Sequence, residues 1–351
     1  MTDTTIPSPR VTGIAAADTM RAVEYDRYGG PEVLCVRRVP RPRPGPREVL
    51  IRVHAAAVNP ADVKIRAGQM KLVSRRRFPK RSGLDFTGEI TAVGGKVTDA
   101  AIGQRVWGFL ADPTGRTGSL ADYITAGTDT FSPAPAALNL RQAAALPSVG
   151  VTALRALHAI LKVRAGHRLL IVGAAGGVGS TAIQLAAATG VTVTALAGPA
   201  NHELCRALGA THVADYTDPT TLTGPFDAVL DCHGSHLPTY RRLLHRRGRI
   251  LSLSPTALGP AALSLLTLGP RIRLTAIRPR RADLITLADH VDTGELHPIV
   301  DAAHPLDDIA TAHRALETGH ARGKIVITVR PNDDRDPRTT HKAGDAPRSA
   351  S

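Results

Sequence analysis

The stretch that decides the fold runs from Arg168 to Ala186 and reads RLLIVGAAGGVGSTAIQLA. Its residues 169–172 form a short apolar, partly β-branched run of the kind that is buried on both faces of a parallel sheet. Small residues follow at once, and from Ser180 onward the apolar positions recur at helical spacing. The stretch therefore predicts a strand, a tight turn and a helix in direct succession.

Three glycines, Gly173, Gly176 and Gly179, occupy every third position of this turn. Each has a physical reason to lack a side chain, namely tight turning, close approach of the backbone to a pyrophosphate, and close packing of helix on strand. A glycine triplet alone is weak evidence, but a second β-rich run at 191–196 completes a βαβ unit. The helix N-terminus then directs free N–H groups at an anion. The residues predicted to bind a dinucleotide here are Gly173, Ala174, Ala175, Gly176, Gly177, Val178 and Gly179.

The turn and the helix after it carry a family resemblance. The motif GAAGGVG followed by IQLA resembles the cofactor loop of the zinc-independent, quinone oxidoreductase-like branch of the medium-chain dehydrogenase/reductase superfamily. The resemblance runs from about Met20 to Val329 and implies an α/β protein, in which a doubly wound Rossmann sheet is inserted in a mostly antiparallel, GroES-like catalytic domain. The expected divisions are a flexible extension at 1–19, the catalytic domain at 20–145 and 280–330, the Rossmann domain at 146–279, and a flexible tail at 331–351.

Composition limits the classes of protein that the chain can belong to. Its 351 residues can hold two domain cores, and no apolar run reaches the roughly 18 residues that span a bilayer. The three cysteines have no paired spacing, which argues against a disulfide framework. Since residues 1–19 lack the pattern of a secretory signal, we expect a cytoplasmic protein without membrane attachment.

The net charge of +14 raises the question of nucleic-acid binding. The basic residues are spread along the whole chain and only 3% of residues are aromatic, so stacking platforms for bases are scarce. We therefore expect a solvated basic surface, a small-molecule substrate and a homodimer, and no specific nucleic acid.

The segment VNPADVKIRAG, residues 58–68, follows an alternating strand. Asn59-Pro60 ends that strand and predicts a helix with Asn59 as its capping residue, Asp62 in its first turn and Lys64 half a turn later. From the residues alone, a capped helix with a surface salt bridge is the favoured interpretation. The resemblance implies more, because zinc-dependent relatives carry their first metal-ligand cysteine in this segment. We take Asn59, Asp62 and Lys64 as the candidate catalytic residues.

A second zinc-site position also differs. Gly83-Leu84-Asp85 stands where zinc enzymes carry Gly-His-Glu, so both expected ligand types are missing and we predict no metal. His202 and Cys205 are three residues apart, but two residues without further ligands are more often ordinary helix residues.

Four more residues are candidates for cofactor contacts. Thr152 stands where relatives place a threonine near the nicotinamide, although a helix N-cap is the alternative. The second strand ends at Leu196 without the acidic residue that binds a ribose 2′-hydroxyl, which favours NADP(H), with Asn201 as a hydrogen-bond donor. The resemblance places Tyr216 against the adenosine and Lys324 in the Gly-Lys signature before the last strand.

Together these features predict a reductase that passes hydride from NADPH to a quinone or an α,β-unsaturated carbonyl compound. The alternatives are an enoyl-thioester reductase of a biosynthetic pathway and a non-catalytic NADPH-binding protein. We expect residues 69–78, a loop rich in arginine and apolar side chains, to line the substrate entrance. Near the C-terminus we predict a strand at 296–300 and a helix at 306–317.

Overall fold

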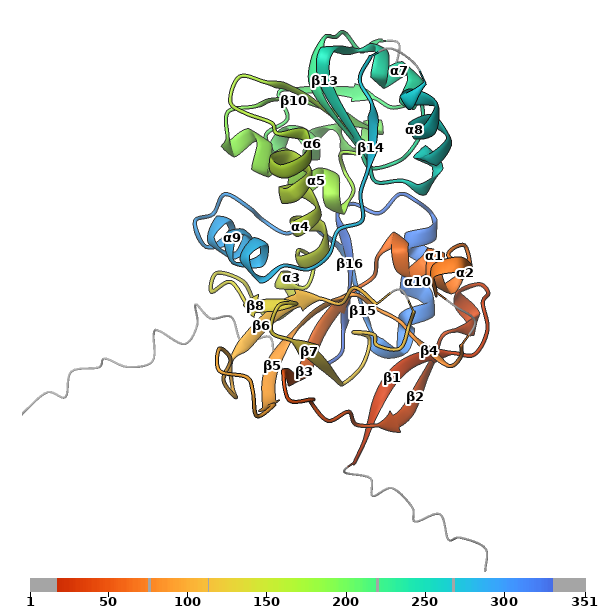
Figure 1. Ribbon diagram of the computed structural model, residues 1–351, viewed down its shortest axis with the longest axis vertical. Helices are drawn as coiled ribbons and strands as arrows, with labels where there is room; N and C mark the ends of the chain where they lie inside the picture. Colours follow the sequence, from red (N-terminus) through yellow and green to blue (C-terminus); the bar gives the residue numbers. More distant parts are fainter. Residues whose placement is uncertain (1–17, 75–76, 113, 219–220, 267–268, 331–351) are drawn as a thin grey trace, which may run out of the picture.

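The computed structural model describes residues 18–330 except 75–76, 113, 219–220 and 267–268. The predicted flexible tail, and the predicted extension up to residue 17, lie outside the described residues. The rest of the chain forms two domains, which Figure 1 shows one above the other.

The upper domain in Figure 1 is built on a six-stranded parallel sheet with the strand order β11-β10-β9-β12-β13-β14. Its strands are β9 (Arg168–Val172), β10 (Thr192–Ala197), β11 (His212–Asp215), β12 (Phe226–Asp231), β13 (Leu244–Ser252) and β14 (Ile272–Leu274). Its helices are α5 (Gly177–Ala188), α6 (His202–Ala207), α7 (Leu237–Arg242) and α8 (Leu258–Leu265). The strand order reverses between β9 and β12, which is where doubly wound sheets open a ligand crevice. The predicted Rossmann sheet is confirmed.

The lower domain is mainly antiparallel. Its larger sheet has the order β15-β16-β3-β5-β6-β8 with β7 paired to β3, and its smaller sheet has the order β2-β1-β4. The bounds of the larger sheet are β3 (Glu48–Ala57), β5 (Asp85–Val93), β6 (Arg105–Phe109), β7 (Tyr123–Gly127), β8 (Phe131–Pro133), β15 (Val300–Pro305) and β16 (Lys324–Thr328). The remaining elements are β1 (Thr19–Tyr25), β2 (Cys35–Pro40), β4 (Lys80–Arg81), α1 (Pro60–Arg66), α2 (Lys71–Ser74), α3 (Leu140–Ala143) and α10 (Ile309–Glu317).

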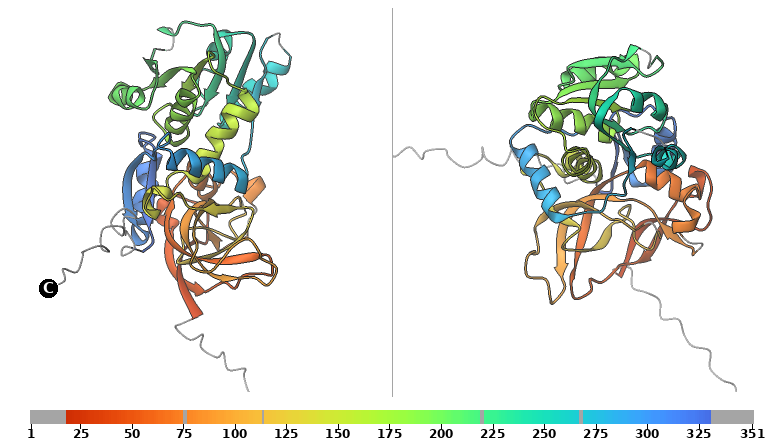
Figure 2. Two further views of the ribbon diagram at one scale, coloured as in Figure 1. Left: turned by 90° about the vertical axis from the view of Figure 1, so that its left-hand side faces the viewer. Right: turned by 45° about the horizontal axis from the view of Figure 1, so that its top comes forward.

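The chain crosses twice between the domains. Helix α4 (Pro147–Arg155) leads from the catalytic domain to the Rossmann domain, and α9 (Arg281–Asp292) leads back. The last strand, β16, then pairs antiparallel with β3, so that Val326 lies opposite Ala57. The Rossmann domain is therefore an insertion, as predicted, and Figure 2 shows the same arrangement from two further sides.

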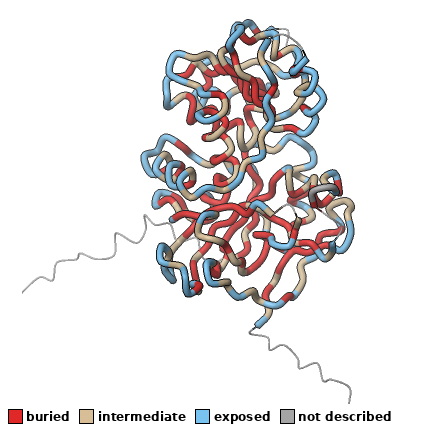
Figure 3. Tube along the Cα trace, in the orientation of Figure 1, coloured by how far each residue is buried: buried red, intermediate tan, exposed pale blue. Residues whose placement is uncertain are grey.

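Buried residues concentrate in the two sheets and along α4 and α5 (Figure 3). One cluster joins the Rossmann sheet to α4 and α5 and includes Leu169, Ile171 and Ile183, all fully buried. A second cluster fills the catalytic sheet, with Ile51 and Phe86 at its centre. The first cluster also contains Trp107 of β6, so it continues from the Rossmann sheet through α4 into the catalytic domain.

Two local predictions are wrong in detail. The strand expected at 296–300 begins at Val300 and continues to Pro305, because only from Val300 does the chain pair with β16. Thr152 is not a helix N-cap, since it lies inside α4, where its hydroxyl donates to the carbonyl of Ser148 at 2.7 Å.

Candidate active site

The glycine turn sits between β9 and α5, and its three spaced glycines differ in what surrounds them. Gly173 has a φ of +72°, a left-handed conformation that favours glycine. A Cβ on Gly179 would lie 2.4 Å from the carbonyl oxygen of Gly173, so this glycine allows helix and turn to pack together. A Cβ on Gly176 would meet only one atom, 3.5 Å away. The space beside Gly176 is therefore available to a ligand.

This turn fits a dinucleotide diphosphate. Gly176 is the N-cap of α5, so the free N–H groups and the positive dipole end of a twelve-residue helix face the turn. Ala174 and Ala175 are buried behind it, while Val178 is half-buried. A Cβ on Gly177 would lie 3.0 Å from Cδ of Lys324, which brings the catalytic domain up to the same turn.

The other cofactor candidates lie where parallel strands end. Tyr216 directly follows β11, and its Cε1 lies 3.1 Å from the point that a Cβ on Gly198 would occupy, just after β10. Tyr216 is 51% exposed and so is available to a ligand. Asn201 lies in the loop after β10, at the start of α6. Both residues lie just beyond the carboxyl ends of neighbouring parallel strands, and their contacts with a cofactor stay a prediction.

A buried polar cluster lies where the two domains meet. Asp85, fully buried, accepts hydrogen bonds at Oδ2 from Asn59 Nδ2 at 2.9 Å, Ser148 Oγ at 2.8 Å and Lys324 Nζ at 3.0 Å. Its Oδ1 accepts from the Ser148 backbone N–H at 2.7 Å. We call Asn59, Asp85, Ser148 and Lys324 the buried network. It joins the start of α1 to β5, α4 and β16.

Asn59 and Lys324 are held by protein groups on every side. The Asn59 amide donates to Asp85 and, at 3.4 Å, to the carbonyl of Ala57, and its Oδ1 accepts from Lys324 Nζ at 2.6 Å. Lys324 Nζ also donates to the carbonyl of Val58 at 2.8 Å. Its three donors are therefore taken, and in this arrangement Lys324 acts as a positioning residue between the glycine turn and Asn59.

Asp62 lies next to the buried network. Asn59 is the N-cap residue of α1, as predicted, and Asp62 completes a capping box because its Oδ2 accepts from the Asn59 backbone N–H at 2.8 Å. Burial raises the pKa of Asp62 to about 6, repulsion from Asp85 adds to the rise, and Lys324 and the Asn59 N–H oppose it. Asp62 is therefore a carboxyl group that titrates close to neutral pH.

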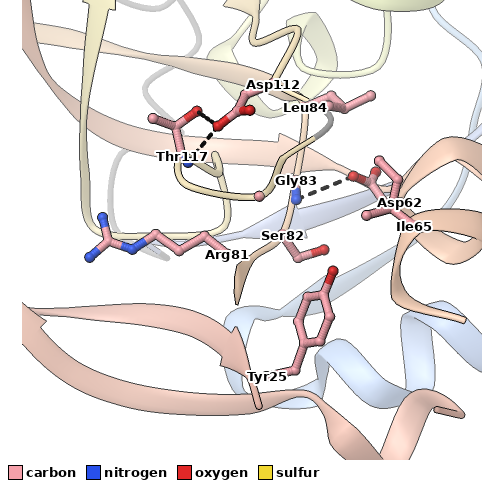
Figure 4. Close-up of a pocket in the computed structure, with 10 residues that line it drawn as sticks. Tyr25, Asp62, Ile65, Arg81, Ser82, Gly83, Leu84, Asp112 and Thr117 are labelled. Atoms are coloured by element: carbon pink, nitrogen blue, oxygen red, sulfur yellow. Dashed lines mark hydrogen bonds between the residues drawn. The ribbon is translucent and has the colours of Figure 1, made fainter. Parts of the chain in front are cut away.

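The other oxygen of Asp62 faces a small pocket (Figure 4). Its Oδ1 accepts from the backbone N–H of Gly83 at 3.3 Å, and the Tyr25 side chain points toward the same space. The pocket volume of about 10 Å³ is room for about one water molecule. This pocket is too small for a substrate, but it brings solvent within reach of Asp62.

The predicted entrance and the predicted salt bridge are only partly described. Lys64 is half-buried on α1 and has no ion pair with any described residue, so the surface salt bridge favoured by the residues alone is absent from the described part. Within 69–78 the structure has the short helix α2 rather than a continuous loop, and residues 75–76 lie outside the described part.

The donor set at the buried network does not fit zinc. An amide, a hydroxyl and a carboxylate already paired with the Lys324 ammonium take the place of the thiolate and imidazole ligands that zinc prefers. In the ranges that the structure describes, no three His, Cys, Asp or Glu side chains are grouped so that they could hold a metal ion.

Sequence reasoning did not assign two members of this site. The sequence marks Asp85 only as the residue in place of a zinc-site glutamate. The available signal for Asp85 was a carboxylate at the start of an apolar strand, two residues after Gly83. No local pattern marks Ser148, because its role depends on α4 approaching β5.

Two family models match the chain. The alcohol dehydrogenase GroES-like domain matches residues 45–136, and the zinc-binding dehydrogenase model matches residues 208–327. These ranges fall in the catalytic domain and in the stretch from the Rossmann domain into β16, respectively.

Curated relatives and solved structures match over nearly the whole chain. The chloroplast envelope quinone oxidoreductase homolog of Arabidopsis thaliana is 32% identical over 329 residues, covering 89% of this chain and 99% of that protein. The mitochondrial NAD(P)H oxidoreductase RTN4IP1 of Homo sapiens is 32% identical over 367 residues, covering 92% of this chain and 91% of that protein. The structure of the quinone oxidoreductase from Coxiella burnetii has a TM-score of 0.84 at 34% identity, covering 89% of this chain and 100% of that one. The chain therefore belongs to the quinone oxidoreductase-like branch of the medium-chain dehydrogenase/reductase superfamily, and it is an oxidoreductase that uses a nicotinamide cofactor.

Proposed function

We propose that this protein is an NADPH-dependent, zinc-independent reductase that transfers a hydride to a quinone or to an α,β-unsaturated carbonyl compound. The observation that carries the proposal is the buried network, in which the Lys324 ammonium neutralises Asp85 where a metal centre would need free ligands. The similar proteins from Arabidopsis thaliana and Coxiella burnetii are named for quinone oxidoreduction, which supports a quinone as acceptor.

The chain's own residues divide the work between binding and positioning. The turn at 173–179 binds the diphosphate, Tyr216 and Asn201 border the adenosine, and Thr152 lies on α4 close to the nicotinamide end. When bound, the cofactor supplies the hydride from C4 of its nicotinamide. Holding two reactants in register is worth up to about 7–11 kcal/mol of barrier, so cofactor positioning provides much of the rate acceleration.

The negative charge that develops on the substrate oxygen needs stabilisation without a metal. We assign this to the Lys64 ammonium and to backbone N–H groups near α1, with Asn59 held in place by Asp85 and Lys324. Asp62 contacts Asn59 through the capping box, and the adjacent water-sized pocket gives it access to solvent protons. In this proposal Asp62 positions Asn59 and holds a proton near the site.

The test is loss of NADPH absorbance with a panel of quinones, enones and enoyl thioesters, each run with NADPH and with NADH. We expect turnover with quinones or enones and a higher kcat/KM with NADPH. Turnover with enoyl thioesters alone would assign the protein to a biosynthetic reduction instead. Cofactor binding without oxidation by any acceptor would reject the reductase proposal, and stoichiometric zinc in a metal analysis would reject its zinc independence.

We also propose a homodimer. Strand β14 is an edge strand of the Rossmann sheet. On α8 beside it, Leu258 is 64% exposed to solvent and Leu265 is 62% exposed. Leu266, directly after α8, is 85% exposed. A second copy offers the same edge and the same leucines, so a twofold axis here covers both apolar surfaces.

The cellular location stays a prediction. No helix within the described ranges combines the length and the apolar character needed to cross a bilayer. Relatives are named as chloroplastic and mitochondrial, so the expected cytoplasmic location rests on the sequence alone.

A further inference from the structure

Arg322 lies in the segment between α10 and β16, in the catalytic domain, yet its side chain contacts the Rossmann domain. Its Nη2 donates to the carbonyl of Ala200 at 3.2 Å. The side chain is exposed, and this is its one hydrogen bond to the described residues. Because a guanidinium carries five N–H donors, most of its hydrogen-bonding capacity remains available.

Ala200 belongs to the loop that follows β10. In a doubly wound sheet, the end of the second strand of the βαβ unit meets the ribose of the adenosine. Tyr216, whose Cε1 lies 3.1 Å from the point that a Cβ on Gly198 would occupy, borders the same loop. Arg322 therefore reaches the place where a ribose 2′-substituent would lie.

The charges around this loop affect how well it can bind a 2′-phosphate. Strand β10 ends at Ala197 without a carboxylate, but Ala197 is paired in register with Asp215 at the end of β11. A hydrogen bond from the Thr217 backbone N–H lowers the pKa of Asp215, so this carboxyl stays charged near neutral pH. His202 is tied by its Nε2 to the carbonyl of Ala197 at 3.1 Å. A 2′-phosphate at this loop would face the charge of Asp215 unless a cation offset it.

The position of Arg322 is fixed by its neighbours. The Gly323 N–H donates to the carbonyl of Ala175 in the glycine turn at 2.8 Å, and Lys324 joins the buried network. A Cβ on Gly323 would lie 2.2 Å from the carbonyl oxygen of Ile299, so this close packing leaves no space for a side chain there. Three consecutive residues thus contact the ribose loop, the diphosphate turn and the buried network in turn.

We propose that Arg322, supplied by the catalytic domain, binds the 2′-phosphate of NADPH and sets the preference for NADPH over NADH. The inference rests on the proposed use of NADPH. Arginine suits this role because its planar fork binds phosphate oxygens through two parallel hydrogen bonds. The sequence hides the residue, because Arg322 lies more than a hundred positions after the loop that it contacts, whereas the nearest cation in sequence is Arg206.

The test measures dissociation constants of the full-length protein by calorimetry for NADPH, NADH, adenosine 2′,5′-bisphosphate and AMP. We expect R322Q to weaken NADPH and the bisphosphate about tenfold and to change NADH and AMP by less than about twofold. R322K, which keeps the charge but not the fork, recovers part of the loss. R314Q on α10, an exposed arginine without a described side-chain partner, is the matched control and leaves all four constants unchanged.

The outcomes separate this inference from the proposed function. If the wild type binds neither NADPH nor NADH, the proposed function fails. If the wild type binds both with equal affinity, or if R322Q binds NADPH as the wild type does, Arg322 is not the 2′-phosphate residue and the inference is overturned. Loss of NADPH binding in R206Q but not in R322Q would assign the role to α6 instead. A thermal melt that matches the wild type shows that R322Q is folded.

Discussion

Asp85 is the residue around which the catalytic end of the site is arranged. It is fully buried and receives hydrogen bonds from Lys324, Asn59 and Ser148. A buried ion pair contributes little relative to an apolar replacement, but removing one partner leaves the other charge uncompensated. The stability of this region therefore depends on the pair being intact.

We expect D85N to destabilise the protein by about 3 kcal/mol or more, because Lys324 keeps its charge without a counter-charge. Urea denaturation of the wild type and the variant measures the difference. D283N, which breaks the partly exposed Arg155–Asp283 ion pair, is the control and costs about 1 kcal/mol or less. Equal losses in the two variants would contradict the role given to Asp85.

Asp62 makes a pH-dependent contribution whose sign follows from its raised pKa. The unfolded group ionises near 3.8 and the folded group near 6, so between these values the folded state binds up to one more proton. The free energy of unfolding therefore falls as the pH rises from about 4 to about 6. D62N removes this component, which urea midpoints at several pH values measure. D289N, at an exposed site on α9, should keep the slope of the wild type, and an unchanged slope in D62N would refute the assignment.

For single residues, the sequence predicted the place in a helix or strand better than it predicted the partners of the side chain. Pattern and capping preferences place Asn59 at a helix start and Asp62 in its first turn, and both are found there. The partners of Asn59 lie on three other elements, at Asp85, Ser148 and Lys324, and no local rule relates them. The occupied amide of Asn59 was therefore not predictable.

The glycine turn shows how an element is built from residues with separate roles. Gly179 is needed by the fold, because a side chain there meets backbone at 2.4 Å, whereas Gly176 has open space beside it. The spacing in sequence predicts that each of the three glycines has a reason to lack a side chain, and the packing shows which of them a side chain would disturb.

We expect G179A to lower mainly the folding stability and G176A to weaken mainly the binding of NADPH. G179A should cost about 1–3 kcal/mol of folding stability through overpacking, and G176A less than about 0.5 kcal/mol. G176A should instead weaken NADPH binding about tenfold or more, because its methyl group lies where the diphosphate approaches the backbone. Denaturation and calorimetry on both variants provide the check. A stable, tightly binding G176A would place the diphosphate elsewhere.

Element types were predictable where periodicity is strong, and boundaries less so. Helix α5 begins at Gly177 rather than Ser180, because the apolar repeat starts later than the backbone turn. The strand predicted at 296–300 begins at Val300, since pairing with β16 and not composition defines it. Pairing with a neighbouring strand therefore sets where a strand such as β15 begins.

At the scale of the whole molecule, the return of the chain to the catalytic domain places β16 beside β3. It also brings Gly323, just before β16, against the glycine turn. The resemblance predicted the insertion, but Arg322 reaching Ala200 and Gly323 reaching Ala175 are contacts between distant parts of the chain. These depend on how the two domains are set against each other. No periodicity in the sequence predicts the relative placement of the two domains.

The exposed leucines beside β14 lead to a prediction about assembly. We expect the wild type to have the mass of a dimer in solution by light scattering, and L258E/L265E to be a monomer, because the two side chains lie two turns apart on α8. I285E, at a 43% exposed site on α9, is the control and stays dimeric. A monomeric wild type would contradict the proposed interface.

The most direct measurement is a calorimetric titration of the purified wild-type protein with NADPH. The account predicts one site per chain with a dissociation constant in the micromolar range or below, reached by docking of the diphosphate at Gly176. No heat with either NADPH or NADH at millimolar concentration would contradict it.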